Sequence, residues 1–249
     1  MKTLFSNRDK AIIIGLYLSK FDMLVLSELG LDGHSHAFNV LGYAIGAKPA
    51  SIKNYRDEFD PYFPNNRKGW HKRPLRQHCK NILEMLSELN LSDFTDLIKS
   101  FIISNYDIEK NIAEIDKTNI SESIAKRLAT GVAAEEYFKL NYTKINEFFG
   151  YDILDTRMLA CGFDFKLSLK NDFYYVEVKG INLNVGSIVM TKKEFSVADQ
   201  LQEKYCLFVV RNFKENPTHM MVFNPVNSFL EFKKNERKVV QVDYSAILR

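Results

Sequence analysis

The chain has 249 residues, of which 46% are hydrophobic and 26% charged, and its formal net charge is only +3. This composition is typical of a folded globular chain of one or two domains and excludes a largely disordered one. No apolar run approaches the roughly 18 residues of a membrane-spanning helix, and Cys79, Cys161 and Cys206 are scattered, so we expect a cytoplasmic protein with no disulfide frame and no contact with a membrane.

A pair of short helices is the first predicted feature that bears on function. Residues 37–46 and 51–60 form the pattern helix, tight turn, helix, and Gly46 can adopt the positive φ that ends a helix. Ser51 could cap the second helix, although Pro49 makes an earlier start possible. The layout is typical of a DNA-binding helix-turn-helix, and equally of an ordinary helical hairpin. Its candidate base-reading residues are Ser51, Lys53, Asn54 and Arg56.

A segment rich in basic residues follows, between positions 65 and 76. It contains the single tryptophan of the chain, Trp70, which we expect to anchor the segment to the core. Basic side chains at this density can follow a phosphate backbone electrostatically; the alternative is a solvated basic loop. The residues of this segment that could contact DNA are Asn66, Arg67, Lys68, His71, Lys72, Arg73 and Arg76.

The middle of the chain has no Pro/Gly linker to mark a domain boundary. Residues 83–111 have a helical pattern that breaks near position 92, and a second helical pattern runs from Ser123 to Tyr142. We therefore expect a helical domain over residues 1–112 and a second domain over residues 113–249.

The helix predicted from Ser123 to Tyr142 carries two adjacent carboxylates, Glu135 and Glu136. Small residues precede them, which would let this helix approach a sheet closely. Either carboxylate could face a site on that sheet, and the alternative is that both lie on the surface.

A predicted β-hairpin is the most informative feature. Its strands are residues 162–167 and 173–180, the second being aromatic and β-branched. Because side chains alternate along a strand, Glu177 and Lys179 share one face. Pairing can bring Asp164 beside Glu177, so that two carboxylates could share a Mg²⁺ with a lysine near the attacking water. The alternative is a solvated hairpin with an exposed Glu–Lys pair.

The remaining elements complete an α/β pattern. Thr191 and Glu194 have the spacing of a capping box and predict a helix that extends to about Lys204. The continuous apolar run 205–210 is typical of a buried strand, and further strands are predicted at 220–223 and 239–242. The resulting order is helix, hairpin, helix, strand, strand.

Asp164, Glu177 and Lys179 resemble the PD-(D/E)xK motif of the restriction-endonuclease-like nucleases. Phe163 stands where the motif has proline, at a position that varies freely in that superfamily. The flanking residues 162–164, 176–180 and 191–194 are similar to an uncharacterised domain family of prokaryotic restriction and defence proteins. The resemblance implies an α/β fold, with a helical N-terminal domain and a restriction-endonuclease-like mixed β-sheet core flanked by helices.

The resemblance also implies an activity, that of a Mg²⁺-dependent, site-specific DNA endonuclease similar to type II restriction enzymes. Asp164, Glu177 and the carbonyl of Val178 would ligate one or two Mg²⁺. Lys179 would orient or deprotonate the attacking water, or stabilise the charge that develops on the phosphate. Glu135 would be an outer metal ligand, with Glu136 as the alternative.

The implied partner is double-stranded DNA, bound by a homodimer that forms in solution or only on DNA. Two alternatives stay open. One is a modification-dependent or repair-type nuclease on the same fold, which would need a pocket for a flipped base that the sequence does not indicate. The other is a DNA-binding regulator without catalysis, whose nuclease fold has decayed.

Overall fold

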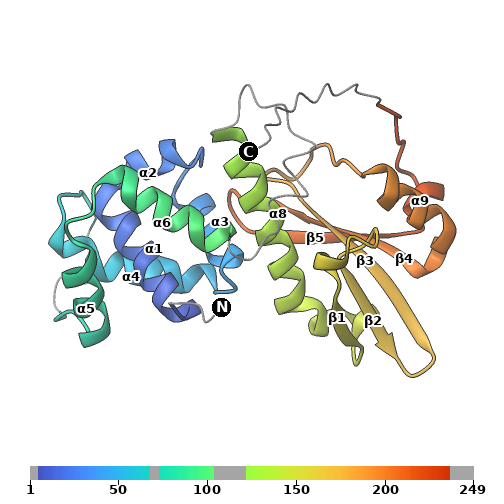
Figure 1. Cartoon of the computed structure of the whole chain (residues 1–249), viewed down its shortest axis with the longest axis horizontal. Coiled ribbons are helices and arrows are strands. Elements are labelled where there is room, and N and C mark those ends of the chain that lie inside the picture. The colour runs from blue at the N-terminus through green and yellow to red at the C-terminus, as the bar shows by residue number, and fades with distance from the viewer. Residues whose placement is uncertain (1–4, 68–72, 104–121, 236–249) are drawn as a thin grey trace, which may run out of the picture.

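The computed structural model describes residues 5–67, 73–103 and 122–235. Helices fill the N-terminal part, and a sheet with flanking helices fills the rest (Figure 1). The predicted strand 239–242, the expected domain boundary and Trp70 lie outside the described residues. In the described part of the chain, no helix is both long and apolar enough to cross a membrane.

Helix α1 (Asn7–Phe21) is the centre of the helical part. All of its residues from Lys10 to Ser19 are buried, because other helices surround it. A capping box between Ser6 and Asp9 fixes its first turn. The other α-helices of this part are α2 (Met23–Glu28), α3 (His34–Ala44), α4 (Pro49–Phe59), α5 (Gln77–Leu86) and α6 (Leu91–Ile103).

The predicted pair of helices is present as α3 and α4. Gly46, in the turn between them, has a φ of +70°, as the sequence indicated. Of the two predicted starts for the second helix the earlier one is correct, since Lys48 is the N-cap and Pro49 the first helical residue. Ser51 therefore lies inside the first turn and does not cap the helix.

Among the described residues, a five-stranded sheet forms the second half of the fold, in the order β1-β2-β3-β4-β5. Strands β3 and β4 are parallel, and all other neighbours are antiparallel. The predicted α/β class with a mixed sheet is therefore confirmed. Strand β1, which the sequence did not predict, is a short edge strand. The strands are β1 (Asp152–Asp155), β2 (Phe165–Leu169), β3 (Asp172–Gly180), β4 (Tyr205–Arg211) and β5 (Thr218–Phe223).

Two helices meet the sheet from opposite faces. Helix α8 (Glu122–Asn141) packs closely on one face: a Cβ added at Gly180 would lie only 3.0 Å from the Cβ of Ala134. Helix α9 (Lys192–Leu201) begins at a capping box formed by Thr191 and Glu194, as predicted. It meets the opposite face, where Lys179 contacts Glu194.

The helical part and the sheet share one hydrophobic core. Helix α8 stands between them (Figure 1), and α3 packs against it. The ring of Tyr43 contacts those of Tyr137 and Phe213, with centroid distances of 5.2 and 6.3 Å. The side chain of Asn39 also donates hydrogen bonds to the carbonyls of Phe213 and Glu215.

Candidate active site

The β2–β3 hairpin brings Asp164 to Glu177. Asp164 immediately precedes β2, and its N–H donates to the carbonyl of Val176 at 2.9 Å. Phe165 pairs with Val176, so the antiparallel register places Asp164 opposite Glu177. The Asp164 carboxylate accepts a hydrogen bond of 2.8 Å from the N–H of Val178. The predicted meeting of these residues is therefore present in the fold.

The carbonyl of Val178 points to the same edge of β3 as its N–H. The N–H and carbonyl of one residue in a strand point to the same edge, and the N–H of Val178 points to Asp164. Pairing with β2 begins only at Val176, so no β2 residue lies opposite this carbonyl. Its oxygen thus faces the same space as the Asp164 carboxylate.

Lys179 lies between two carboxylates. Its ammonium donates to Glu177 at 2.5 Å and to Glu194, at the start of α9, at 2.8 Å. Glu177 is buried and Lys179 half-buried. The sequence indicated that Glu177 and Lys179 share a face, but it did not indicate that Glu194 completes their contacts.

Glu135 reaches the site from α8. Its carboxylate is buried and accepts a hydrogen bond of 2.8 Å from Arg157. The guanidinium of Arg157 also lies 3.1 Å from Glu136 and 2.5 Å from Asp155. Sequence reasoning missed Arg157, which follows β1 and carries no local motif.

Burial and mutual repulsion oppose ionisation of all three acidic residues. Burial raises the pKa of Asp164, and the charge of Glu135 adds to the shift. Burial also raises the pKa of Glu177, with a further contribution from Asp164. For Glu135, burial again raises the pKa, Arg157 opposes the shift, and Glu177 adds to it. Glu135 on α8 therefore interacts electrostatically with the hairpin.

The donor set fits a hard divalent cation. Two carboxylates and a carbonyl are the oxygen ligands that Mg²⁺ prefers, and an added positive charge would relieve the repulsion that raises these pKa values. Within the described residues, no three acidic, histidine or cysteine side chains are gathered as a metal-binding group. Glu177 instead faces Lys179, and Glu135 faces Arg157.

The predicted DNA-contacting residues differ in exposure and in their contacts, and the exposed Lys53 lies 3.0 Å from the carboxylate of Asp57. On α4, Lys53 and Asn54 are exposed, and Ser51 is half-buried in the first turn. Arg56 is buried, bonds Asp57 at 2.5 Å and lies over the ring of Phe38. This position does not suit the base-reading role predicted for Arg56, because the polar end of its side chain already has a partner inside the fold.

The residues of the basic segment also differ in exposure. Arg67 bridges Asp60 and Asp22 at 2.8 and 2.6 Å, and Arg76 bonds Glu58. These two arginines tie the segment to the helical part. Asn66 and Arg73 are exposed, whereas Lys68, His71 and Lys72 lie outside the described residues.

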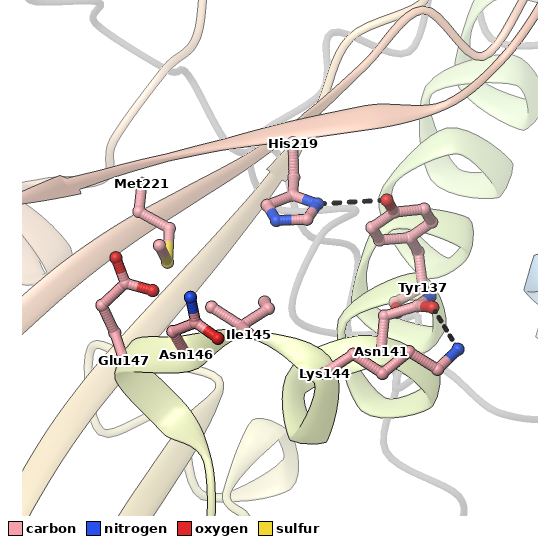
Figure 2. Close-up of a pocket in the computed structure, with 8 residues that line it drawn as sticks. All are labelled: Tyr137, Asn141, Lys144, Ile145, Asn146, Glu147, His219 and Met221. Atoms are coloured by element: carbon pink, nitrogen blue, oxygen red, sulfur yellow. Dashed lines mark hydrogen bonds between the residues drawn. The ribbon is translucent and has the colours of Figure 1, made fainter.

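A separate pocket of about 340 Å³ opens beside β5 (Figure 2). The hydroxyl of Tyr137 lies 3.1 Å from Nδ1 of His219, whose ring stacks on Phe208. Burial lowers the pKa of His219, which favours the uncharged form of this ring. The lining residues are Tyr137, Asn141, Lys144, Ile145, Asn146, Glu147, His219 and Met221.

Comparison with known proteins identifies a similarity to a protein family. Residues 134–223, just over a third of the chain, match the family model described as the C-terminal part of protein NO VEIN. The match begins on α8 beside Glu135 and ends with β5, so it contains the hairpin and the start of α9. No curated protein and no solved structure matches the chain. The region similar to the NO VEIN family is therefore the region that carries the candidate active site.

Proposed function

We propose that the protein is a Mg²⁺-dependent, site-specific endonuclease of double-stranded DNA, of the type II restriction class. The observation that carries the proposal is the meeting of Asp164, Glu177 and Lys179 at one edge of the hairpin. Buried carboxylates with raised pKa values are typical of functional sites. The match to the NO VEIN C-terminal family model supports a nuclease-like core over the same residues.

Each residue of the site has a role in this proposal. Asp164, Glu177 and the Val178 carbonyl would hold the metal, and Glu135 would hold it through water. Bound Mg²⁺ would polarise the scissile phosphate and activate a water molecule. Lys179, already within hydrogen-bonding distance of Glu177, would orient that water or stabilise the charge developing on the phosphate.

Digestion of plasmid DNA tests the activity. The purified protein with Mg²⁺ should give discrete bands, whereas a smear would indicate a non-specific nuclease, and binding without cleavage would indicate a regulator. Asp164→Ala and Lys179→Ala should abolish cleavage while DNA affinity stays within about tenfold, because the metal site supplies chemistry more than affinity. Asp172→Ala, at the far end of the same hairpin, is the matched control and should cleave normally. Full cleavage by Asp164→Ala would refute the assignment.

DNA recognition in this proposal rests on exposed side chains. Lys53 and Asn54 are the base-reading candidates on α4, and Arg73 belongs with Lys68 and Lys72 in the basic segment. Replacing Lys68, Lys72 and Arg73 by alanine should weaken binding and reduce its salt dependence, because each phosphate contact releases counterions. Arg76→Ala is the comparison: it should destabilise the fold, since Glu58 loses its partner. An unchanged salt dependence in the triple variant would exclude this segment from DNA binding.

Two chains at the cut site are part of the same proposal. Cleavage of both strands requires two active sites, and the described residues contain one Asp–Glu–Lys set, so a two-fold dimer is the simplest assembly. Sedimentation of the protein alone and with its target duplex distinguishes a dimer in solution from one formed on DNA. One chain per duplex with concerted cleavage of both strands would rule out the dimer.

A modification-dependent nuclease is the second candidate, and the pocket beside β5 favours it. Its volume of about 340 Å³ falls in the range of small-molecule sites. Ile145 and Met221 offer apolar surfaces, while Asn146 and Glu147 have the amide and carboxylate groups that read base edges. Under this candidate, methylated plasmid is cleaved and unmethylated plasmid is not, and Glu147→Ala abolishes the difference. Equal cleavage of both plasmids would exclude it.

A further inference from the structure

Lys179 contacts two carboxylates that come from different elements of the fold. Glu177, at 2.5 Å, belongs to the same strand and is a metal ligand in the proposed function. Glu194, at 2.8 Å, comes from α9, on the other side of a loop. Lys179 is thus fixed both by its own strand and by the first turn of a helix.

Glu194 is itself held in place by the start of α9. Its Oε2 accepts a hydrogen bond of 3.0 Å from the N–H of Thr191 as well as the bond from Lys179. The hydroxyl of Thr191 accepts in return from the N–H of Glu194 at 3.2 Å. A side chain fixed in a capping box has little rotational freedom, so Glu194 presents its charge at a defined point.

Metal binding would change the balance between the two contacts. A carboxylate that ligates a divalent cation gives up much of its attraction for a neighbouring ammonium, because the cation neutralises its charge. Glu177 would be affected in this way, whereas Glu194 is turned to the helix start and would not. Glu194 would then be the remaining fixed anion beside Lys179.

We propose that Glu194 is a positioning residue that holds the Lys179 ammonium at the active site through the first turn of α9. The proposal rests on the proposed function, because it assigns Glu194 a part in the same reaction. It differs from a purely structural role, in which Glu194 serves only to cap the helix. The two roles depend on different properties of the side chain, namely its charge and its hydrogen-bond acceptor.

Two variants separate these properties. Glu194→Gln keeps an acceptor for the Thr191 N–H, since glutamine serves in a capping box, but it removes the charge. Thr191→Ala removes the hydroxyl cap and leaves the charge of Glu194. The melting temperature reports the cap, and the behaviour of Lys179 reports the charge.

The first measurement does not require nuclease activity. Acetylation of Lys179 by an excess of reagent, followed by mass spectrometry, should be several-fold faster in Glu194→Gln than in the wild type when Mg²⁺ is present. Thr191→Ala should show the wild-type rate although its melting temperature is lower by a few degrees. An unchanged rate in Glu194→Gln, or an equal increase in Thr191→Ala, would overturn the proposal.

The second measurement is kinetic. Glu194→Gln should lower kcat by about 10- to 100-fold, as is usual for the partner of an active-site group, with KM within about threefold because the charge acts after DNA has bound. Thr191→Ala should keep kcat within about threefold of the wild type. A wild-type kcat in Glu194→Gln would refute the positioning role. An inactive wild-type protein would refute the proposed function, and the acetylation rates alone would then test whether Glu194 holds Lys179.

Discussion

Three acidic side chains of this fold have raised pKa values. Glu135 lies on α8, Asp164 immediately before β2 and Glu177 within β3, and the charge of each raises the pKa of another member of the group. Lys179 and Arg157 offset part of their repulsion. A like-charged group of this kind reduces stability and is retained where function requires it.

Removal of one charge should therefore stabilise the protein in the absence of metal. Asp164→Asn keeps an oxygen to accept from the N–H of Val178, so the backbone is undisturbed. We expect its free energy of unfolding at pH 8 in EDTA to exceed that of the wild type by about 0.5–2 kcal/mol, measured by thermal denaturation. Asp172→Asn is the control: Lys204 holds the pKa of Asp172 low, at about 2, so its loss should give no gain. A lower melting temperature for Asp164→Asn would contradict this account.

The same effect should depend on pH. The folded-state pKa is about 8 for Asp164 and about 7 for Glu135, above the ordinary values of 3.8 and 4.5. At a pH between the ordinary and the folded-state pKa, the unfolded chain has released protons that the folded chain still binds. These groups therefore lower the free energy of unfolding as pH rises from about 4 to 8. The difference between Asp164→Asn and the wild type should widen from pH 5 to pH 8 in EDTA, and shrink when Mg²⁺ is added. A constant difference would show that Asp164 is not the group responsible.

Arg157 should be coupled energetically to Glu135. Arg157→Ala leaves Glu135 buried beside Glu136 without its partner, and we expect a loss of about 1–3 kcal/mol. In the double variant Arg157→Ala/Glu135→Gln the uncompensated charge is gone, so part of the loss should be regained. Urea denaturation of the two single variants and the double variant measures the coupling. Strictly additive effects would show that the ion pair contributes nothing.

At the scale of residues, local spacing in the sequence can predict contacts within one hairpin. It cannot predict side-chain contacts between elements that are far apart in the chain. Asp164, Glu177 and Lys179 could be predicted, since strand alternation and one hairpin suffice to bring them together. The contact from Arg157 to Glu135 joins separate elements and leaves no local signal. For the same reason, sequence alone could not show that Arg56 is buried against Phe38. A basic residue in the sequence shows a charge but not its partner.

At the scale of elements, two helical glycines differ in how closely neighbouring atoms approach them. A Cβ added at Gly15 of α1 would lie 2.5 Å from the Cβ of Tyr55 on α4, whereas one added at Gly131 of α8 has no described atom within 4 Å. Gly15→Ala should therefore destabilise the protein by about 1–3 kcal/mol through overpacking. Gly131→Ala should stabilise it by about 0.5–1 kcal/mol through helix propensity. Thermal denaturation of the pair checks this, and equal effects would mean that α1 and α4 do not pack as described.

Elements with strong periodic patterns were predicted well, and marginal ones were not. The α8 pattern, the hairpin, the capping box of α9 and the apolar strand β4 all agree with the structure. Strand β1 was missed because three of its four residues are exposed, so no alternation marks it. Helix α4 begins at Pro49 rather than Ser51 because proline satisfies the first helical position at no cost in hydrogen bonding.

At the scale of the whole molecule, the sequence suggested two domains and the structure shows a shared core. The order of the predicted elements indicated an α/β protein with a helical part, but it could not predict that α3 packs on α8. That contact depends on residues far apart in the chain, such as Tyr43 with Tyr137 and Phe213. Helix α8 therefore belongs to both the helical part and the sheet.

A shared core should make the protein unfold as one unit. Separating the parts would expose the apolar face of α8 and break the bonds from Asn39 to the carbonyls of Phe213 and Glu215. We therefore expect a single calorimetric transition, even though chains of this length often unfold in steps. Tyr43→Ala should lower the temperature of that transition without splitting it, because the lost contacts contribute to both parts. Two transitions in the wild type, with only one of them moved by Tyr43→Ala, would show instead that the helical part and the sheet are independent folding units joined by a weak interface.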